Sequence, residues 1–177
     1  MLSPFIERYL RVNGIPVRLL TEEEAEVHPP RSEDDLVVVR VRTVLLEIDG
    51  GDEVLCAIPE NAEVDLDALC DLLDAEEAVI CEEGRQLEVF PGCEFGAAPP
   101  FGGLWGLPLI VDSDVELSDR VLVPAGRHDL FLEMRTTDLL YLEDPVVAEI
   151  AAHPGEPWRH AMPVQWHPPG EAPTLRT

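Results

Sequence analysis

The segment PGCEFGAAPPFGGLWG, residues 91–106, is the most informative stretch of this chain, because it holds five glycines and three prolines in sixteen residues. Glycine lets the backbone approach a ligand closely, and proline keeps a loop stiff while removing a hydrogen-bond donor. Such a stiff loop of small residues, hereafter the Gly/Pro loop, is typical of elements that hold a small substrate group. A structural turn between two elements is the alternative, and the segment alone leaves both open.

A family resemblance is carried by part of this loop and by two other segments. Residues 96–102 followed by Leu107-Pro108-Leu109-Ile110-Val111-Asp112, and the corner Ala125-Gly126-Arg127-His128, resemble the YbaK/EbsC family, which includes the prolyl-tRNA-synthetase-associated editing domain. Upstream, residues 42–50 resemble the first long strand and turn of that family. The resemblance covers about residues 36–150, and it is most specific in the Gly/Pro loop and in the AG-x-H corner.

The resemblance implies an α+β fold, with a strongly curved, barrel-like mixed β-sheet surrounded by helices in a single domain. Characterised members of the family hydrolyse the ester bond of mischarged tRNAs. Their Gly/Pro loop lines the pocket for the aminoacyl group, beside the AG-x-H corner. The residues that the resemblance assigns to substrate binding are Gly96, Ala97, Ala98, Pro99, Pro100, Phe101, Gly102, Gly126 and His128.

Arg42 stands where the family has its most important side chain, a lysine beside the ester and the tRNA 3′ end. The chain contains no lysine, and all twelve basic residues are arginines. Arginine keeps the positive charge and can grip a phosphate or carboxylate, but it does not deprotonate at ordinary pH. Arg42 is therefore the candidate catalytic residue if the role is to hold and polarise. Arg40 lies on the same strand face and is a candidate substrate-binding partner.

Two functions remain open from the sequence. The first is an aminoacyl-tRNA deacylase acting in trans, in which backbone N–H groups of the Gly/Pro loop stabilise the carbonyl oxygen as charge develops. The second is a non-catalytic ligand-binding or regulatory module that keeps the fold but has lost deacylase activity. Arg42 in place of lysine, and a short span at residues 21–35 where relatives have a helix, favour the second function.

The composition predicts one folded domain with an unusual surface. The 177 residues are 46% hydrophobic, and the formal net charge is −24. This acidity favours solubility and suggests a salt-rich cytoplasm, where screening is strong. It opposes contacts with phosphates, so binding to the 3′ end of mischarged tRNA is expected to be weak or salt-dependent, with a synthetase or regulatory protein as a possible partner. The absence of a long apolar run and of a signal peptide predicts a cytoplasmic protein without membrane contact.

Neither a cofactor nor a metal site is expected. His153, His160 and His167 recur every seven residues, but the prolines around them prevent the helix that would bring them together. Asp112 is expected to cap the turn that follows it. No C-x-x-C pair occurs, and packing is the expected role of the four cysteines, which are Cys56, Cys70, Cys81 and Cys93.

Hydrophobic periodicity predicts the order of the elements. Strands are expected over residues 15–20, 36–48, 54–58, 78–81, 107–111, 120–123 and 130–134. Helices are expected over residues 4–14, 65–73, 82–90, 136–142 and 145–152, with at most a helical turn in 21–35. The domain is expected to span residues 1–152, followed by a tail at 153–177 that contains six prolines.

Overall fold

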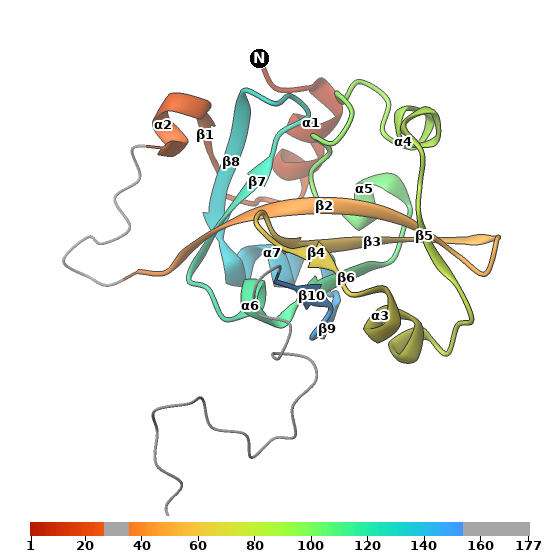
Figure 1. The fold of residues 1–177 in the computed structure, drawn as a ribbon. Helices are drawn as coiled ribbons and strands as arrows, with labels where there is room; N and C mark the ends of the chain where they lie inside the picture. The colour runs from red at the N-terminus through yellow and green to blue at the C-terminus, as the bar shows by residue number, and fades with distance from the viewer. Residues whose placement is uncertain (27–35, 154–177) are drawn as a thin grey trace, which may run out of the picture.

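A mixed β-sheet forms the centre of the molecule (Figure 1). The structure, a computed structural model, describes residues 1–26 and 36–153. In this part of the chain the strands run in the order β1-β8-β7-β2-β3-β6-β9, with β5 paired to β2 beside this path and β4 paired to β10. The strands are β1 (Arg18–Thr21), β2 (Val38–Ile48), β3 (Asp52–Pro59), β4 (Glu63–Val64), β5 (Ala78–Ile80), β6 (Leu109–Asp112), β7 (Arg120–Pro124), β8 (Leu130–Arg135), β9 (Val146–Ala148) and β10 (Ala151–Ala152).

Short helices surround the sheet. The helices among the described residues are α1 (Pro4–Val12), α2 (Glu22–Glu26), α3 (Leu66–Leu73), α4 (Glu83–Val89), α5 (Gly102–Trp105), α6 (Ser113–Glu116) and α7 (Thr136–Glu143). The local sequence explains their beginnings. Pro4 opens α1 at a position where its missing N–H costs nothing. The Asp65 side chain accepts a hydrogen bond from the Ala68 N–H, at 3.0 Å, and so caps α3.

Strand β2 is shared by two halves of the sheet. One edge pairs with β3 in antiparallel register, from Val41 opposite Pro59 to Ile48 opposite Asp52. The other edge pairs with β7 only over Val38–Arg40 and with β5 only over Leu46–Ile48. Between these two pairings, residues 41–45 of β2 have no partner strand on that edge among the described residues. The Gly/Pro loop and the corner after β7 lie against this gap, so it positions the candidate site.

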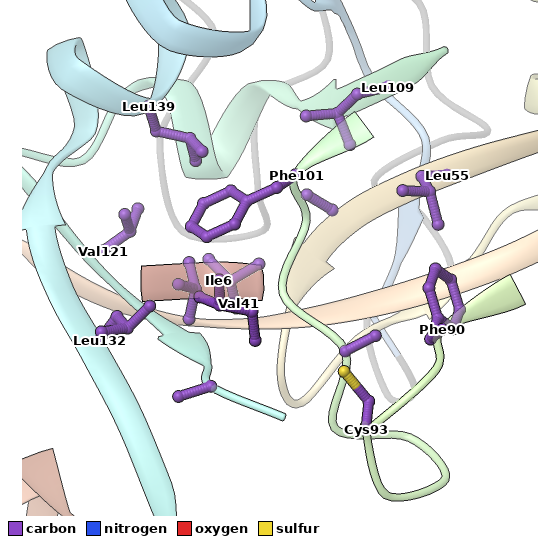
Figure 2. Packing of buried hydrophobic residues seen from close by; sticks show 14 of the residues in the cluster. Ile6, Val41, Leu55, Phe90, Cys93, Phe101, Leu109, Val121, Leu132 and Leu139 are labelled. Atoms are coloured by element: carbon purple, nitrogen blue, oxygen red, sulfur yellow. The ribbon is translucent and has the colours of Figure 1, made fainter. Parts of the chain in front are cut away.

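The two largest hydrophobic clusters among the described residues fill the space on either side of the sheet. In the larger one, the fully buried Phe101 ring lies close to Ile6 of α1, Val41 of β2 and Leu139 of α7 (Figure 2). The smaller cluster includes Leu69 of α3. Figure 1 shows α1 and α3 on opposite sides of the β2–β3 pair. The alternation of side chains along β2 therefore supplies both clusters from one strand.

The α+β class and the mixed sheet predicted from the sequence are confirmed. The sheet is open rather than closed as a barrel, because β1 and β9 form its two ends. The helix predicted over residues 145–152 is wrong, since the chain forms β9 and β10 there. Buried Asp112 explains the difference: Oδ1 accepts hydrogen bonds from the N–H groups of Ile150 and Ala151, each at 2.9 Å, and these N–H groups cannot serve a helix.

Other sequence expectations for the elements have mixed outcomes. The Asp112 cap is present, because Oδ2 accepts from the Asp114 N–H at 3.0 Å. The short elements β4, α5 and α6 were not predicted. The span at 21–35 contains the five-residue α2, and its remainder, 27–35, lies outside the described residues, as does the predicted tail beyond His153. No helix in the described part of the chain has the length and apolarity to span a membrane.

The carboxylate of Glu143 connects three helices, α1, α5 and α7. Glu143 of α7 accepts a hydrogen bond from the Tyr9 hydroxyl at Oε1 and from the Gly103 N–H at Oε2, both at 2.8 Å. Burial raises the pKa of Glu143 above its ordinary value of 4.5, although the Gly103 and Tyr9 hydrogen bonds act in the opposite direction. Burial and the hydrogen bond to Glu143 also raise the pKa of Tyr9.

The raised pKa of Glu143 predicts that this carboxyl group makes the stability of the protein depend on pH. The variant Glu143→Gln should lack that contribution. Because the folded pKa lies above the unfolded one, the folded state binds more protons, and stability falls as pH rises through the folded pKa. The free energy of unfolding of the natural protein minus that of Glu143→Gln should therefore be larger near pH 4 than near pH 7. Urea unfolding at the two pH values measures this difference, and a difference that grows with pH would contradict the assignment.

Candidate functional site

A pocket of about 280 Å³ lies at the gap along β2. Its walls come from β2, from Gly96 and Ala97 of the Gly/Pro loop, and from β7, β8 and the segment between them. Polar side chains line it from three directions, with Arg42 on β2, His128 after β7 and Glu60 after β3. Val41 and Phe131 supply apolar surface. The pocket therefore combines an apolar wall with a few charged groups, as small-molecule sites commonly do.

Arg42 carries a positive charge that no carboxylate in the described part of the chain pairs with. Its side chain is exposed on β2, and its Nη1 lies 3.4 Å from the carbonyl oxygen of Ala62. It makes no ion pair with any residue in the described ranges. Since the guanidinium keeps its charge at all ordinary pH values, Arg42 presents an available donor fork to an anionic or carbonyl group in the pocket.

Arg40, two residues earlier on β2, is held in place by its neighbours. Its Nη2 lies 3.1 Å from Glu22 Oε1, and its Nε lies 3.0 Å from Glu60 Oε2, although Nε is not aligned as a hydrogen-bond donor. Its guanidinium carbon lies 4.5 Å from the centre of the Phe131 ring. Two carboxylates and one aromatic face therefore engage Arg40, which makes it part of the pocket wall.

The structure divides the Gly/Pro loop into two parts. Gly96 and Ala97 line the pocket, and Gly96 adopts φ +78°, a conformation that favours glycine. The N–H of Gly96 donates to no acceptor among the described residues. The remaining predicted substrate-binding residues of the loop are buried and are absent from the pocket lining: Ala98, Pro99, Pro100, Phe101 and Gly102.

The buried part of the loop has evident packing roles. The carbonyl oxygen of Pro99 accepts a hydrogen bond from Trp105 Nε1 at 3.1 Å. Phe101 is fully buried in the larger cluster. A Cβ on Gly102 would collide with the Leu107 carbonyl oxygen, so no side chain fits there. These residues set the path of the loop and thereby place Gly96 and Ala97 at the pocket.

The AG-x-H corner lies directly against the Gly/Pro loop. Gly126 adopts φ +90°, and its N–H donates to the Ala97 carbonyl oxygen at 2.7 Å. A Cβ at Gly126 would lie 3.4 Å from Cys93 Sγ, which limits the space for a side chain. The His128 side chain is 66% exposed and lines the pocket. The structure thus brings Arg40, Arg42, Gly96, Ala97 and His128 to one pocket. Gly126 is absent from the pocket lining and contacts it through its hydrogen bond to Ala97.

Four contributors to this site were missed from the sequence. Glu22 and Glu60 hold Arg40, and Phe131 lies under its guanidinium. Glu94 contacts the His128 backbone N–H through Oε2 at 3.0 Å. With 36 acidic residues in the chain, nothing local distinguishes Glu22 or Glu60. The position of Glu94, two residues before Gly96, is the only signal that would have pointed to it.

The cysteines and His153 are absent from the pocket lining. Cys56, Cys81 and Cys93 are buried, and burial raises the pKa of the Cys93 thiol to about 11. Cys93 packs in the larger cluster. His153 Nε2 lies 3.1 Å from Asp114 Oδ2. Within the described residues no group of three potential metal ligands occurs, and His160 and His167 lie outside them.

Comparison with known proteins identifies the family. A family model of the aminoacyl-tRNA editing domain matches residues 17–142, and the chain therefore belongs to the aminoacyl-tRNA editing domain family. The family's match covers the pocket and every candidate site residue. No curated protein sequence matches the chain.

Solved structures share the fold. A candidate trans-editing enzyme for prolyl tRNA synthetase superposes with a TM-score of 0.68 at 20% identity, covering 86% of this chain and 99% of that one. A candidate signal transduction protein from Marinobacter aquaeolei VT8 gives 0.67 at 24% identity, covering 86% of this chain but 31% of that one. A hypothetical protein gives 0.68 at 20% identity, with 84% and 99% covered. At these identities the likeness concerns the fold alone.

Proposed function

We propose that this protein is an aminoacyl-tRNA deacylase that acts in trans on mischarged tRNA. The observation that carries the proposal is the pocket in which Arg42, without an ion-pair partner among the described residues, faces the same space as Gly96 and His128. Membership of the editing-domain family supports the reaction class. The fold it shares with a candidate trans-editing enzyme for prolyl tRNA synthetase supports action in trans.

The reaction needs few groups from the protein. A water oxygen adds to the ester carbonyl carbon, the bond to the ribose oxygen breaks, and a proton passes to that oxygen, which releases the amino acid and the free 3′ end. Arg42 would hold the 3′ end and the ester through its charged donors. The free N–H of Gly96 would donate to the carbonyl oxygen as negative charge develops there.

His128 and Arg40 would have supporting roles in this reaction. The imidazole of His128 lies at the pocket edge, where it can exchange a proton with water or with the leaving ribose oxygen. Arg40 would shape the wall rather than bind phosphate, because Glu22 and Glu60 already engage it. The buried part of the Gly/Pro loop, including Phe101, would act by supporting Gly96 and Ala97.

Electrostatics favour a small contact with the tRNA. The net charge of −24 repels a polyanion, and added salt screens that repulsion over about 3 Å at 1 M. We infer that recognition is concentrated on the 3′ end and is weak unless salt is high or a synthetase or regulatory protein assists. This inference fits a protein of a salt-rich cytoplasm, in which the acidic surface remains soluble.

The proposal is tested with a panel of mischarged tRNAs. Proline tRNA charged with alanine or with cysteine, beside correctly charged proline tRNA, would be incubated with the purified protein at about 0.1 M and about 1 M salt. We expect faster release of one of the wrong amino acids than of proline, with a larger rate at high salt. Release at the rate of the protein-free control for every substrate would refute the proposed activity for this panel.

A non-catalytic ligand-binding or regulatory module is the second candidate function. Arginine at position 42 favours it, because a guanidinium cannot supply the neutral amine that a lysine can. Helix α2, ahead of β2, has only five residues, whereas the family resemblance implies a longer helix at this place. An amide-linked, non-hydrolysable aminoacyl-adenosine would bind to either kind of protein. Binding of this analogue, together with no hydrolysis of mischarged tRNA, would favour the non-catalytic module.

A further inference from the structure

Glu94 connects the two sides of the pocket, and none of the roles proposed above uses its side chain. Its Oε2 accepts a hydrogen bond from the His128 backbone N–H at 3.0 Å. The same oxygen lies 3.9 Å from Nε2 of the His128 imidazole. Glu94 belongs to the Gly/Pro loop, whereas His128 ends the corner after β7. One side chain therefore bridges two segments that are 34 residues apart in the sequence.

Backbone hydrogen bonds reinforce this bridge on both sides. The Glu94 N–H donates to the Gly126 carbonyl oxygen at 2.8 Å, and the Glu94 carbonyl oxygen accepts from the Ala97 N–H at 3.0 Å. The Gly126 N–H in turn donates to the Ala97 carbonyl oxygen at 2.7 Å. A Cβ placed on Gly96 would lie 3.8 Å from His128 Cε1, so the loop and the imidazole are within van der Waals range.

Only one hydrogen bond in this network belongs to the Glu94 side chain, the one that it accepts from the His128 N–H, and its approach to the imidazole at 3.9 Å is longer. The three backbone hydrogen bonds persist in any variant that keeps the local conformation. The side chain is 51% exposed, so its removal leaves no buried cavity and lets water reach the His128 N–H. Losing it should therefore loosen the position of His128 without unfolding the domain.

We propose that Glu94 is a positioning residue that fixes the His128 corner against Gly96 and so sets the spacing across the pocket. The inference rests on the proposed deacylase function, because the spacing matters for the ester. Glu94 acts as a hydrogen-bond acceptor for backbone, and its charge is not required. Removing a residue that orients a reacting group commonly lowers activity by about 10- to 100-fold. Because the backbone hydrogen bonds survive in a Glu94 variant, we expect a loss at the lower end of this range.

Two variants and a control separate positioning from charge. Glu94→Ala is expected to lower kcat on the preferred mischarged tRNA by about tenfold, with KM changed by less than about twofold. Glu94→Gln should stay within about threefold of the natural protein, because its amide oxygen can accept from the His128 N–H. Glu83→Ala, at an exposed position on α4, removes one acidic charge elsewhere and should leave kcat unchanged. Thermal unfolding of all four proteins checks that the fold is intact.

Amide NMR gives a readout that does not depend on activity. In Glu94→Ala the His128 N–H should shift upfield and exchange faster with solvent, and in Glu94→Gln it should keep its protection. Activity of Glu94→Ala equal to that of the natural protein, or equal losses in both Glu94 variants, would overturn the inference while leaving the proposed function intact. An inactive natural protein would overturn the proposed function and the contribution of Glu94 to it, and the NMR comparison would still show whether Glu94 holds the corner.

Discussion

Arg42→Ala is expected to lower kcat/KM for a mischarged tRNA by about 100-fold, which corresponds to ~2.7 kcal/mol of transition-state stabilisation. Among the described residues the guanidinium makes no ion pair, and its only hydrogen bond there is the one to the Ala62 carbonyl oxygen, at 3.4 Å. Its removal therefore costs the fold little. It removes the unbalanced positive charge that the pocket offers to the 3′ end, and hydrogen bonds from charged groups are the strong ones.

Two further variants give this prediction its control. Arg42→Lys keeps the charge but loses the planar fork, so we expect it to retain activity within about tenfold of the natural protein. Arg135→Ala removes an arginine from the far end of β8, where it pairs with Asp138 at 2.9 Å, and should leave activity unchanged. Equal activity in Arg42→Ala and the natural protein would contradict the assignment. Higher activity in Arg42→Lys would show that arginine weakens an otherwise sound pocket.

Phe101→Ala is expected to lower the free energy of unfolding by about 3–5 kcal/mol, the usual cost of truncating a fully buried phenylalanine. The ring has no exposed surface, and its centre lies 5.8 Å from that of Tyr9. Figure 2 shows Ile6, Val121 and Leu139 around it. The substitution opens a cavity between α1, α7 and the sheet, where several elements meet and cannot all move inward.

Urea unfolding at neutral pH measures this loss. Phe95→Ala is the matched control, because Phe95 belongs to the same loop but is 44% exposed, and it should cost less than about 1 kcal/mol. Equal losses in the two variants would show that Phe101 does not anchor the loop. Normal stability together with impaired substrate binding in Phe101→Ala would instead indicate that Phe101 contributes to substrate binding.

The fold was largely predictable because strong local signals agreed with one another. The alternating valines before Arg42, the Asp49-Gly50 turn and the Asp65 cap each specify an element from its own neighbourhood. The helix predicted over residues 145–152 was wrong for the opposite reason. Their conformation depends on pairing with β6 and on the buried Asp112 side chain, which is distant in sequence. The Val146-Val147 pair carried a strand preference that outweighed the helical start expected at Pro145.

The site was predictable only in part. Position 42 and the corner at His128 followed from the family resemblance, and the structure places both at one pocket. Glycine and proline content predicts a stiff loop but does not say which of its residues face a ligand, so Phe101 could not be separated from Gly96. The roles of Glu60 and Glu94 arise from contacts made only after folding.

The most direct test of the proposed deacylase is a single-turnover measurement of alanine release from alanyl-tRNA specific for proline, with excess protein at about 1 M salt. Hydrolysis in the absence of protein and with Arg42→Ala would be measured beside it. The account predicts a rate about 100-fold above that of Arg42→Ala, with free alanine and intact tRNA as products. Release that matches the protein-free rate for alanine, and likewise for cysteine on the same tRNA, would contradict it.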